Sequence, residues 1–289
     1  MKLATKIVSM VSLAAVLAGS PLLAGDGKTF KEKVVVEEAT KWWGASLSTG
    51  WDSLYMFRGV NVLSHGAYGN NSNYGSGIYW TDLSFTWNIT PSDTLTIGSW
   101  MAFGTQNTSY KEDDIYLNYT HTIGDLALSA GYIFYYVFPT GANLYANELN
   151  VKAAYNLHFG SVTVTPSLAY YFNLGPNFGS SANGLVKTAS SYLLLRVDSS
   201  IPVYKDIISL TPWIAYGTNF EFNPRLTSDG STDFFNGANN IEVGVGLPVK
   251  LSSVVSVTGY VAYSYAFYNL WGTTDPSTVY GGAKVTFTF

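Results

Sequence analysis

The three histidines are the first side chains to consider for catalysis, because an imidazole beside a serine and a carboxylate can act as a general base. His65 lies in an expected loop, His121 near the end of an alternating segment and His158 in an expected turn. None of them shares a strand face with a serine and a carboxylate, and neither a Gly-x-Ser-x-Gly elbow nor a His-Glu-x-x-His zinc motif occurs. Because the chain also contains no cysteine, the sequence predicts no enzyme, no cofactor and no transition-metal site.

A run of three carboxylates, Glu112, Asp113 and Asp114, stands at the end of an expected loop. Such a run offers oxygen ligands to a hard cation, but its spacing matches no calcium-binding loop. Two interpretations stay open, a cation site and a solvated loop that attracts cations weakly. The sequence favours the solvated loop.

Charged residues inside alternating segments form the more informative set, because they share one parity and therefore one face. They are expected to point into a common interior, and the candidate pore-lining set is Asp52, Arg58, Asp82, Asp114, Glu148, Lys152, Arg196, Asp198, Glu242 and Lys284. One interpretation is a hydrated pore whose mixed charges influence permeation. The other is a set of internal ion pairs that brace a closed structure, and the sequence supports both equally.

The segments that carry these charges alternate apolar and polar residues with the period of two that marks a strand. A first strand from Trp43 is expected to continue through Tyr55 and Phe57, which have outward parity. Five hairpins and a closing strand follow, at residues 79–103, 115–138, 149–172, 193–216, 241–267 and 279–289. About twelve strands of roughly ten residues each match the length that a tilted transmembrane strand requires.

The connections between these strands are asymmetric. Tight turns are expected at one end, near Pro91, Gly124, Phe159, Lys205 and Lys250, whereas the longest loops are expected at the other, over residues 60–75, 174–188 and 219–238. Short periplasmic turns and long external loops are typical of outer-membrane barrels, and outward aromatics collect beside the expected external loops, as interface girdles do. The sequence therefore predicts an all-β fold over residues 43–289, a transmembrane antiparallel up-and-down β-barrel of about 12 strands.

The amino-terminal residues have the pattern of a secretory signal peptide over residues 1–24. Lys2 and Lys6 precede an apolar run over residues 7–17, and small residues lead to an exit at Ala24. Residues 25–42 are expected to form a solvated periplasmic lead-in. No later stretch supplies the 18 or more apolar residues of a transmembrane helix.

The closing strand ends on Phe289 with one apolar and one polar face, and it resembles the terminal strand that the barrel-assembly machinery of the bacterial outer membrane recognises. An edge strand of a soluble sandwich alternates in the same way. Composition separates the two classes, because charged residues make up only 12% and aromatic residues 16% of the chain. Without Lys2 and Lys6 the net charge is about −6, which argues against nucleic acid as a partner.

Two short stretches resemble one family. Residues 51–60, Trp-Asp-Ser-Leu-Tyr-Met-Phe-Arg-Gly-Val, are similar to the first-strand pattern Ser-x-Tyr-x-Phe/Tyr-Arg-Gly of the TorF-type porin family (Gcw_chp), and residues 131–136 with Glu148 give a second local match. The resemblance implies an outer-membrane barrel and supplies no catalytic residue.

Two function classes remain. A passive channel for small hydrophilic solutes or ions fits the polar lumen, whereas a non-conducting structural or adhesive barrel fits the long external loops and a plugged interior. The expected partners are outer-membrane lipid, the barrel-assembly machinery and small solutes, and the oligomeric state is left open.

Overall fold

The computed structural model describes residues 42–63, 77–106, 110–138, 144–175, 189–270 and 276–289. The expected signal peptide, the expected lead-in apart from Trp42, and His65 lie outside these ranges. Within the described ranges, no helix is long and apolar enough to cross a membrane.

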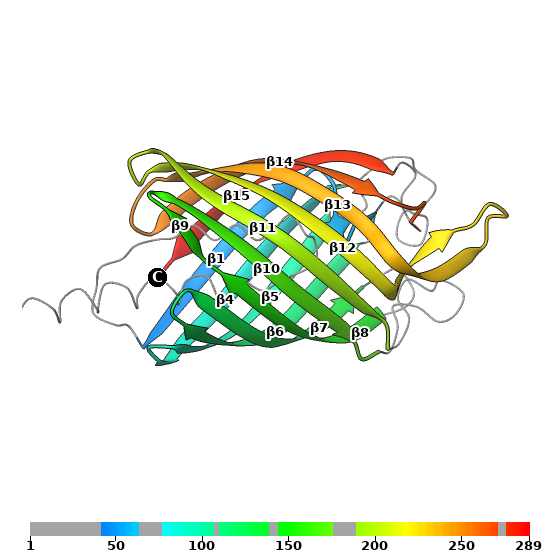
Figure 1. The fold of residues 1–289 in the computed structure, drawn as a ribbon, viewed down its shortest axis with the longest axis horizontal. Helices are drawn as coiled ribbons and strands as arrows, with labels where there is room; N and C mark the ends of the chain where they lie inside the picture. Colours follow the sequence, from blue (N-terminus) through cyan, green and yellow to red (C-terminus); the bar gives the residue numbers. More distant parts are fainter. Residues whose placement is uncertain (1–41, 64–76, 107–109, 139–143, 176–188, 271–275) are drawn as a thin grey trace, which may run out of the picture.

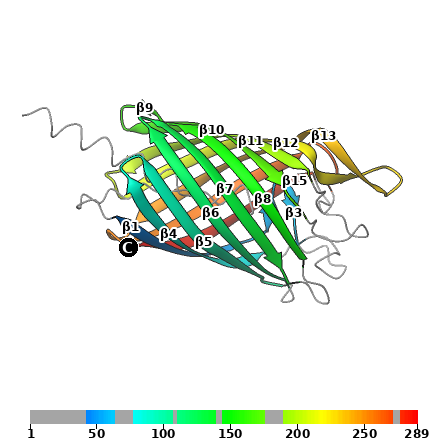
Figure 2. The ribbon, with the colours of Figure 1, turned by 90° about the horizontal axis from the view of Figure 1, so that it is seen from below.

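One antiparallel sheet closes on itself and forms a barrel, which Figures 1 and 2 show from two directions. Its long strands are β1 (Trp43–Asp52), β4 (Ile78–Thr90), β5 (Asp93–Gly104), β6 (Lys111–Ile123), β7 (Leu126–Val137), β8 (Leu144–Tyr155), β10 (Val162–Asn173), β11 (Ser191–Tyr204), β12 (Ile208–Leu226), β13 (Thr232–Lys250), β14 (Val255–Ala266) and β15 (Ser277–Thr288). Each strand pairs with the next along the chain, and β15 pairs with β1. A short strand β9 (Leu157–Phe159) continues β8 beyond Asn156. The predicted twelve-stranded antiparallel barrel is confirmed.

Alternating residues produce this wall because successive side chains of a strand point to opposite faces. Along β6, Leu117 is 43% exposed on the outer surface, whereas its neighbour Tyr116 is 1% exposed in the interior. The outer surface is a band of exposed aliphatic side chains, and a soluble protein seldom exposes so large an apolar area.

Most exposed outward aromatic side chains lie toward the two ends of the barrel, whereas Tyr132 lies at mid-depth beside Leu117. The end with the long hairpin carries Tyr79, Phe103, Phe138, Tyr145, Tyr170, Tyr263, Tyr265 and Phe267. The end with the short turns carries Trp43, Trp87, Tyr155, Phe159, Tyr204 and Phe289. The two groups mark the two membrane interfaces, and the short turns identify their end of the barrel as periplasmic and the opposite end as external.

The predicted tight turns are confirmed at the periplasmic end. Gly124, Gly160 and Lys205 have positive φ angles of 61°, 63° and 50°, a backbone conformation that tight hairpin turns use. Both Trp43 and Phe289 lie at this end as well. An even number of wall strands requires that arrangement.

The expected external loop at residues 219–238 is wrong, because β12 and β13 continue through most of it and leave only residues 227–231 as the turn. This long hairpin projects beyond the barrel at the external end (Figure 1). Its Asn, Gly, Pro and Asp content is typical of a loop, but Pro224 pairs with Phe234 and Arg225 with Asp233. The pairing shifts between Phe220 and Pro224, so the strand bends there.

The expectation that the first strand continues to Phe57 is also wrong. The wall strand β1 ends at Asp52, and residues 53–63 fold into the barrel as an inner hairpin with strands β2 (Met56–Phe57) and β3 (Val60–Asn61). Tyr55, predicted to face outward, is 2% exposed in the interior. The reversal of the chain is built at Arg58 and Gly59, whose φ angles of 50° and 79° suit a two-residue hairpin turn.

Candidate functional site

The tip of the inner hairpin is held by a buried ion pair. Arg58 donates from Nη1 to Glu148 Oε2 at 2.7 Å and from Nη2 to Glu148 Oε1 at 2.8 Å. The Tyr135 hydroxyl donates to the same Oε1 at 3.1 Å. Both charged side chains are almost fully buried. A bidentate pair of this kind fixes the orientation of the guanidinium as well as its position.

Four aromatic rings surround the guanidinium of Arg58. Its Cζ atom lies 4.8 Å from the ring centroid of Phe57, 4.2 Å from Tyr171, 5.1 Å from Tyr192 and 4.3 Å from Phe222. These distances are within the range of cation–π attraction. Glu148, Tyr135 and the four rings together form what we call the Arg58 site.

The backbone of the hairpin tip is held separately from the side chain. The backbone carbonyl oxygen of Arg58 accepts hydrogen bonds from Asn223 Nδ2 at 3.0 Å and from Asn239 Nδ2 at 2.7 Å. Asn240 Oδ1 accepts from Asn239 at 2.9 Å and from the Tyr192 hydroxyl at 2.8 Å. The asparagines of β12 and β13 therefore bind the hairpin tip to the wall.

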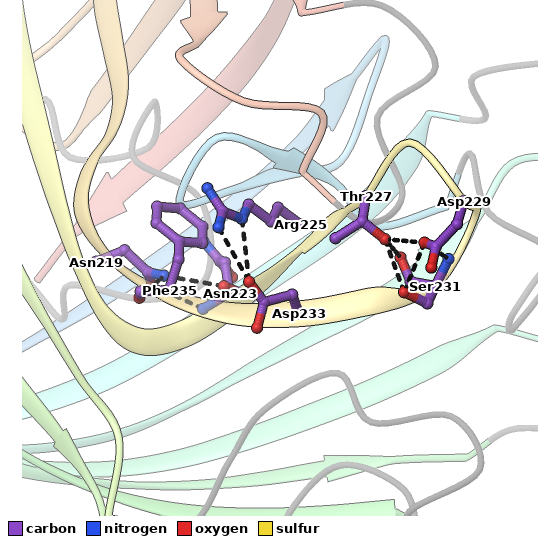
Figure 3. A network of polar contacts seen from close by, with 8 residues as sticks. All are labelled: Asn219, Asn223, Arg225, Thr227, Asp229, Ser231, Asp233 and Phe235. Atoms are coloured by element: carbon purple, nitrogen blue, oxygen red, sulfur yellow. Dashed lines mark hydrogen bonds and ion pairs between the residues drawn. The ribbon is translucent and has the colours of Figure 1, made fainter.

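The bend in β12 brings Phe222 into the Arg58 site. Asn219 stabilises that bend, and Figure 3 shows it beside Asn223 and Phe235. Its Oδ1 accepts from the backbone N–H groups of Phe222 at 3.0 Å and Asn223 at 2.7 Å. Its Nδ2 donates to the carbonyl oxygens of Asn223 and Phe235, both at 2.9 Å. A single buried asparagine thus replaces the strand pairing that is lost at the bend.

The outer part of the long hairpin carries its own polar contacts (Figure 3). Arg225 Nη2 donates to Asp233 Oδ2 at 3.0 Å across the two strands. At the tip, the hydroxyls of Thr227 and Ser231 donate to Asp229, and these hydrogen bonds lower the pKa of the Asp229 carboxyl to about 2. The tip therefore keeps its negative charge at any physiological pH.

Gly59→Ala is expected to destabilise the folded barrel by about 1 kcal/mol or more. The φ angle of Gly59 is +79°, and a Cβ atom there would lie 2.7 Å from Cβ and Cγ of Asn240. Urea titration of the purified protein, followed by tryptophan fluorescence, measures the change. The matched control is Gly124→Ala, where φ is +61° but a Cβ would meet nothing within 4 Å. Equal losses for the two variants would contradict close packing of the hairpin tip.

A second buried network lies beside the first. Arg196 Nη2 is 2.8 Å from Asp198 Oδ1, and Arg196 Nη1 is 4.0 Å from Glu242 Oε1. Glu242 also accepts from Trp213 Nε1 at 2.7 Å and from the Tyr280 hydroxyl. Arg196 and Glu242 therefore both have polar partners in the barrel interior.

The structure places the predicted charged residues as follows. Asp52 accepts from the Tyr260 hydroxyl at 2.7 Å, and Asp82 accepts from the Tyr116 hydroxyl at 2.7 Å. Asp114 is fully buried, whereas Lys152 and Lys284 are half-buried. All of the set except Arg58 belong to wall strands, and Arg58 belongs to the inner hairpin. The structure brings together Arg58 with Glu148, and Arg196 with Asp198 and Glu242.

The expected solvated loop at Glu112, Asp113 and Asp114 is wrong, because all three lie within β6. Glu112 accepts from the hydroxyls of Tyr55 at 2.7 Å and Tyr110 at 2.6 Å. Asp113 accepts from the Ser99 hydroxyl at 2.7 Å. Throughout the described ranges, no three His, Cys, Asp or Glu side chains are grouped so that they could hold a metal ion.

Both described histidines take part in contacts near the periplasmic end. His121 Nδ1 lies 2.8 Å from Asp93 Oδ1, which also accepts from the Tyr119 hydroxyl. His158 Nε2 lies 3.3 Å from Asp125 Oδ1. These are hydrogen bonds that join neighbouring strands and turns at the rim of the barrel.

The interior changes character along the barrel. Its external half contains the buried aromatic and charged networks, with Tyr55, Trp100, Tyr116 and Tyr192 nearly inaccessible. The periplasmic half is lined by small hydroxyl and amide side chains, of which Thr94, Thr96, Thr120, Asn156, Ser256 and Thr258 are buried. The others are half-buried: Ser46, Ser48, Ser84, Thr86, Asn118, Ser129, Thr163, Thr165 and Ser167. We call this half the vestibule. The inner hairpin was not predicted from the sequence. The Arg58-Gly59 pair is the local sequence signal for its turn.

No protein-family model matches the chain, and no curated protein matches it either, so the resemblance to the TorF-type family is not supported at the level of a family. Solved structures do match. The COG4313 outer membrane channel from Pseudomonas putida F1 superposes with a TM-score of 0.56 at 12% identity, over 87% of this chain and 97% of that one. The chain folds as an outer-membrane β-barrel. A second structure, from work on the in-meso crystallization of membrane proteins, superposes on the barrel with a TM-score of 0.52 at 11% identity, over 85% and 84% of the two chains.

Proposed function

We propose that the barrel is an outer-membrane channel for small hydrophilic solutes or ions, closed at its external half by the inner hairpin. The vestibule has a polar lining, part of which is half-buried, and this supports entry of such solutes from the periplasmic side. Lys152, Asp198 and Lys284 are half-buried there, where they are able to act on a passing solute. We assign the barrel no catalytic step.

The observation that carries this proposal is that the closing element is separate from the wall. Strands β2 and β3 form a two-stranded sheet of their own and do not join the barrel sheet. The inner hairpin is attached to the wall at its tip through the Arg58 site and the asparagines Asn223 and Asn239. Its displacement would therefore open the external half without breaking any wall strand.

A non-conducting structural barrel is the second candidate, and one observation favours it. The external half contains a cluster of buried side chains, with the ring centroids of Tyr55 and Trp100 at 5.8 Å and those of Tyr55 and Tyr110 at 6.0 Å. Buried ion pairs and hydrogen bonds satisfy many of the charges in this half. A permanently closed barrel requires such an interior.

Conductance measurements in planar bilayers separate the two candidates. The variant replaces residues 54–62 with a short Gly-Ser linker and carries Glu148→Gln, so that Glu148 does not remain as a buried carboxylate without Arg58. Glu112 loses Tyr55 in this variant but keeps its hydrogen bond from Tyr110. We expect the conductance of the variant to be several-fold higher than that of the natural protein. The control replaces residues 227–231, outside the barrel, and should conduct like the natural protein. A folded hairpin-deleted barrel that passes no current would favour the structural candidate.

A further inference from the structure

The side chain of Arg58 occupies a site that the barrel wall supplies almost entirely. Glu148 comes from β8, Tyr135 from β7, Tyr171 from β10 and Tyr192 from β11, and Phe222 comes from the bend in β12. The inner hairpin contributes only Phe57 and the arginine itself. Five neighbouring strands therefore converge on one guanidinium group.

The chemistry of this site selects a flat cation with several N–H donors. A carboxylate with both oxygens facing one guanidinium accepts two parallel hydrogen bonds, which a compact ammonium cannot donate in that geometry. The aromatic rings attract positive charge toward their faces and replace the water that the cation loses. None of these wall groups requires that the guanidinium belong to the same chain.

We propose that the Arg58 site is a binding site for small guanidinium-bearing solutes and that Arg58 is its built-in occupant. The proposal rests on the proposed channel function in one respect, since such a solute would reach the site through the lumen. A bound solute would compete with the Arg58 side chain for Glu148 and for the wall rings. The tethered arginine is present at a high effective concentration, so binding to the natural protein is expected to be weak.

Removal of the arginine side chain should empty the site without releasing the hairpin. The carbonyl oxygen of Arg58 is held by Asn223 and Asn239 independently of the side chain. Arg58→Ala therefore leaves Glu148 and the wall rings in place around a space of guanidinium size. The same variant makes the site available to a guanidinium ion from solution.

The test measures the thermal unfolding of Arg58→Ala in detergent, by gel mobility and circular dichroism, with millimolar guanidinium chloride, tetramethylammonium chloride or sodium chloride. We expect saturable stabilisation by guanidinium alone, and at a concentration tenfold above its Kd the ratio of folded to unfolded protein rises about elevenfold. The natural protein and the double variant Arg58→Ala, Glu148→Gln should show no such stabilisation. Equal responses of the single and double variants, or no response of the single variant, would overturn the proposal.

A second measurement covers the case in which Arg58→Ala does not fold. Its refolding yield is then compared with and without millimolar guanidinium chloride, and a yield restored by guanidinium supports the site. A yield that stays at zero, while Arg58→Lys folds, overturns it. Neither readout needs current through the barrel. Stabilisation by guanidinium in a barrel that never conducts would support the binding site and contradict the channel function. Conduction without stabilisation would support the channel function and contradict the binding site.

Discussion

Arg58→Ala is expected to lower the free energy of unfolding by about 3–5 kcal/mol, because it leaves the carboxylate of Glu148 buried without its cation. Glu148 has a side-chain exposure of 2%, so water cannot replace the missing partner. The four rings around the guanidinium also lose their contact with it. Equilibrium unfolding in urea, in lipid vesicles and without added guanidinium, measures the change.

The matched control for this prediction removes both charges at once. In Arg58→Met, Glu148→Gln, neither position of the former pair carries a buried charge, and the apolar methionine chain still contacts the rings. We expect a considerably smaller loss than for Arg58→Ala, since replacement of a whole buried pair is often close to neutral. If Arg58→Ala costs less than the double variant, the ion pair does not hold the inner hairpin.

Leu117→Arg is expected to destabilise the barrel by about 2–4 kcal/mol, the cost of an arginine on the lipid face near the middle of the membrane. Leu117 lies midway along β6 and is 43% exposed on the outer surface. It pairs with Ile97 on one side and Tyr132 on the other, which also face outward. The same vesicle-based urea titration measures the loss.

The control for Leu117→Arg is the next residue along the strand. Asn118 points into the vestibule and is half-buried, so an arginine there remains hydrated and should cost much less. Similar losses for the two variants would mean that the outward band does not face lipid. A larger loss for Asn118→Arg would contradict the accessible vestibule.

The wall strands were predictable because their signal is local. Alternation depends only on neighbouring residues, and a shift by one position would turn every apolar side chain from lipid to lumen. The turns near Gly124, Phe159 and Lys205 were predictable for the same reason, since a tight hairpin needs particular backbone conformations at a few adjacent positions. The long external hairpin was not predictable in this way, because its Asn, Gly and Pro residues are typical of loops. Only the pairing across the hairpin makes these residues part of a strand.

In the sequence, Tyr55 and Phe57 continue the alternation of the first strand. A prediction from that alternation alone therefore made the first wall strand too long. A wall strand continues only while it has partners on both sides, and the pairing of β1 with β15 and with β4 ends at Asp52. The reversal at Arg58 and Gly59 then takes the chain into the barrel.

Parity also placed Arg58 and Glu148 on inward faces, since a charge is costly against lipid. It could not pair them, because they are 90 residues apart in sequence and meet only where the inner hairpin enters the closed barrel. The sequence thus determined which side chains avoid lipid. The tertiary structure alone decided which of them meet, because those contacts depend on how the strands close around the lumen.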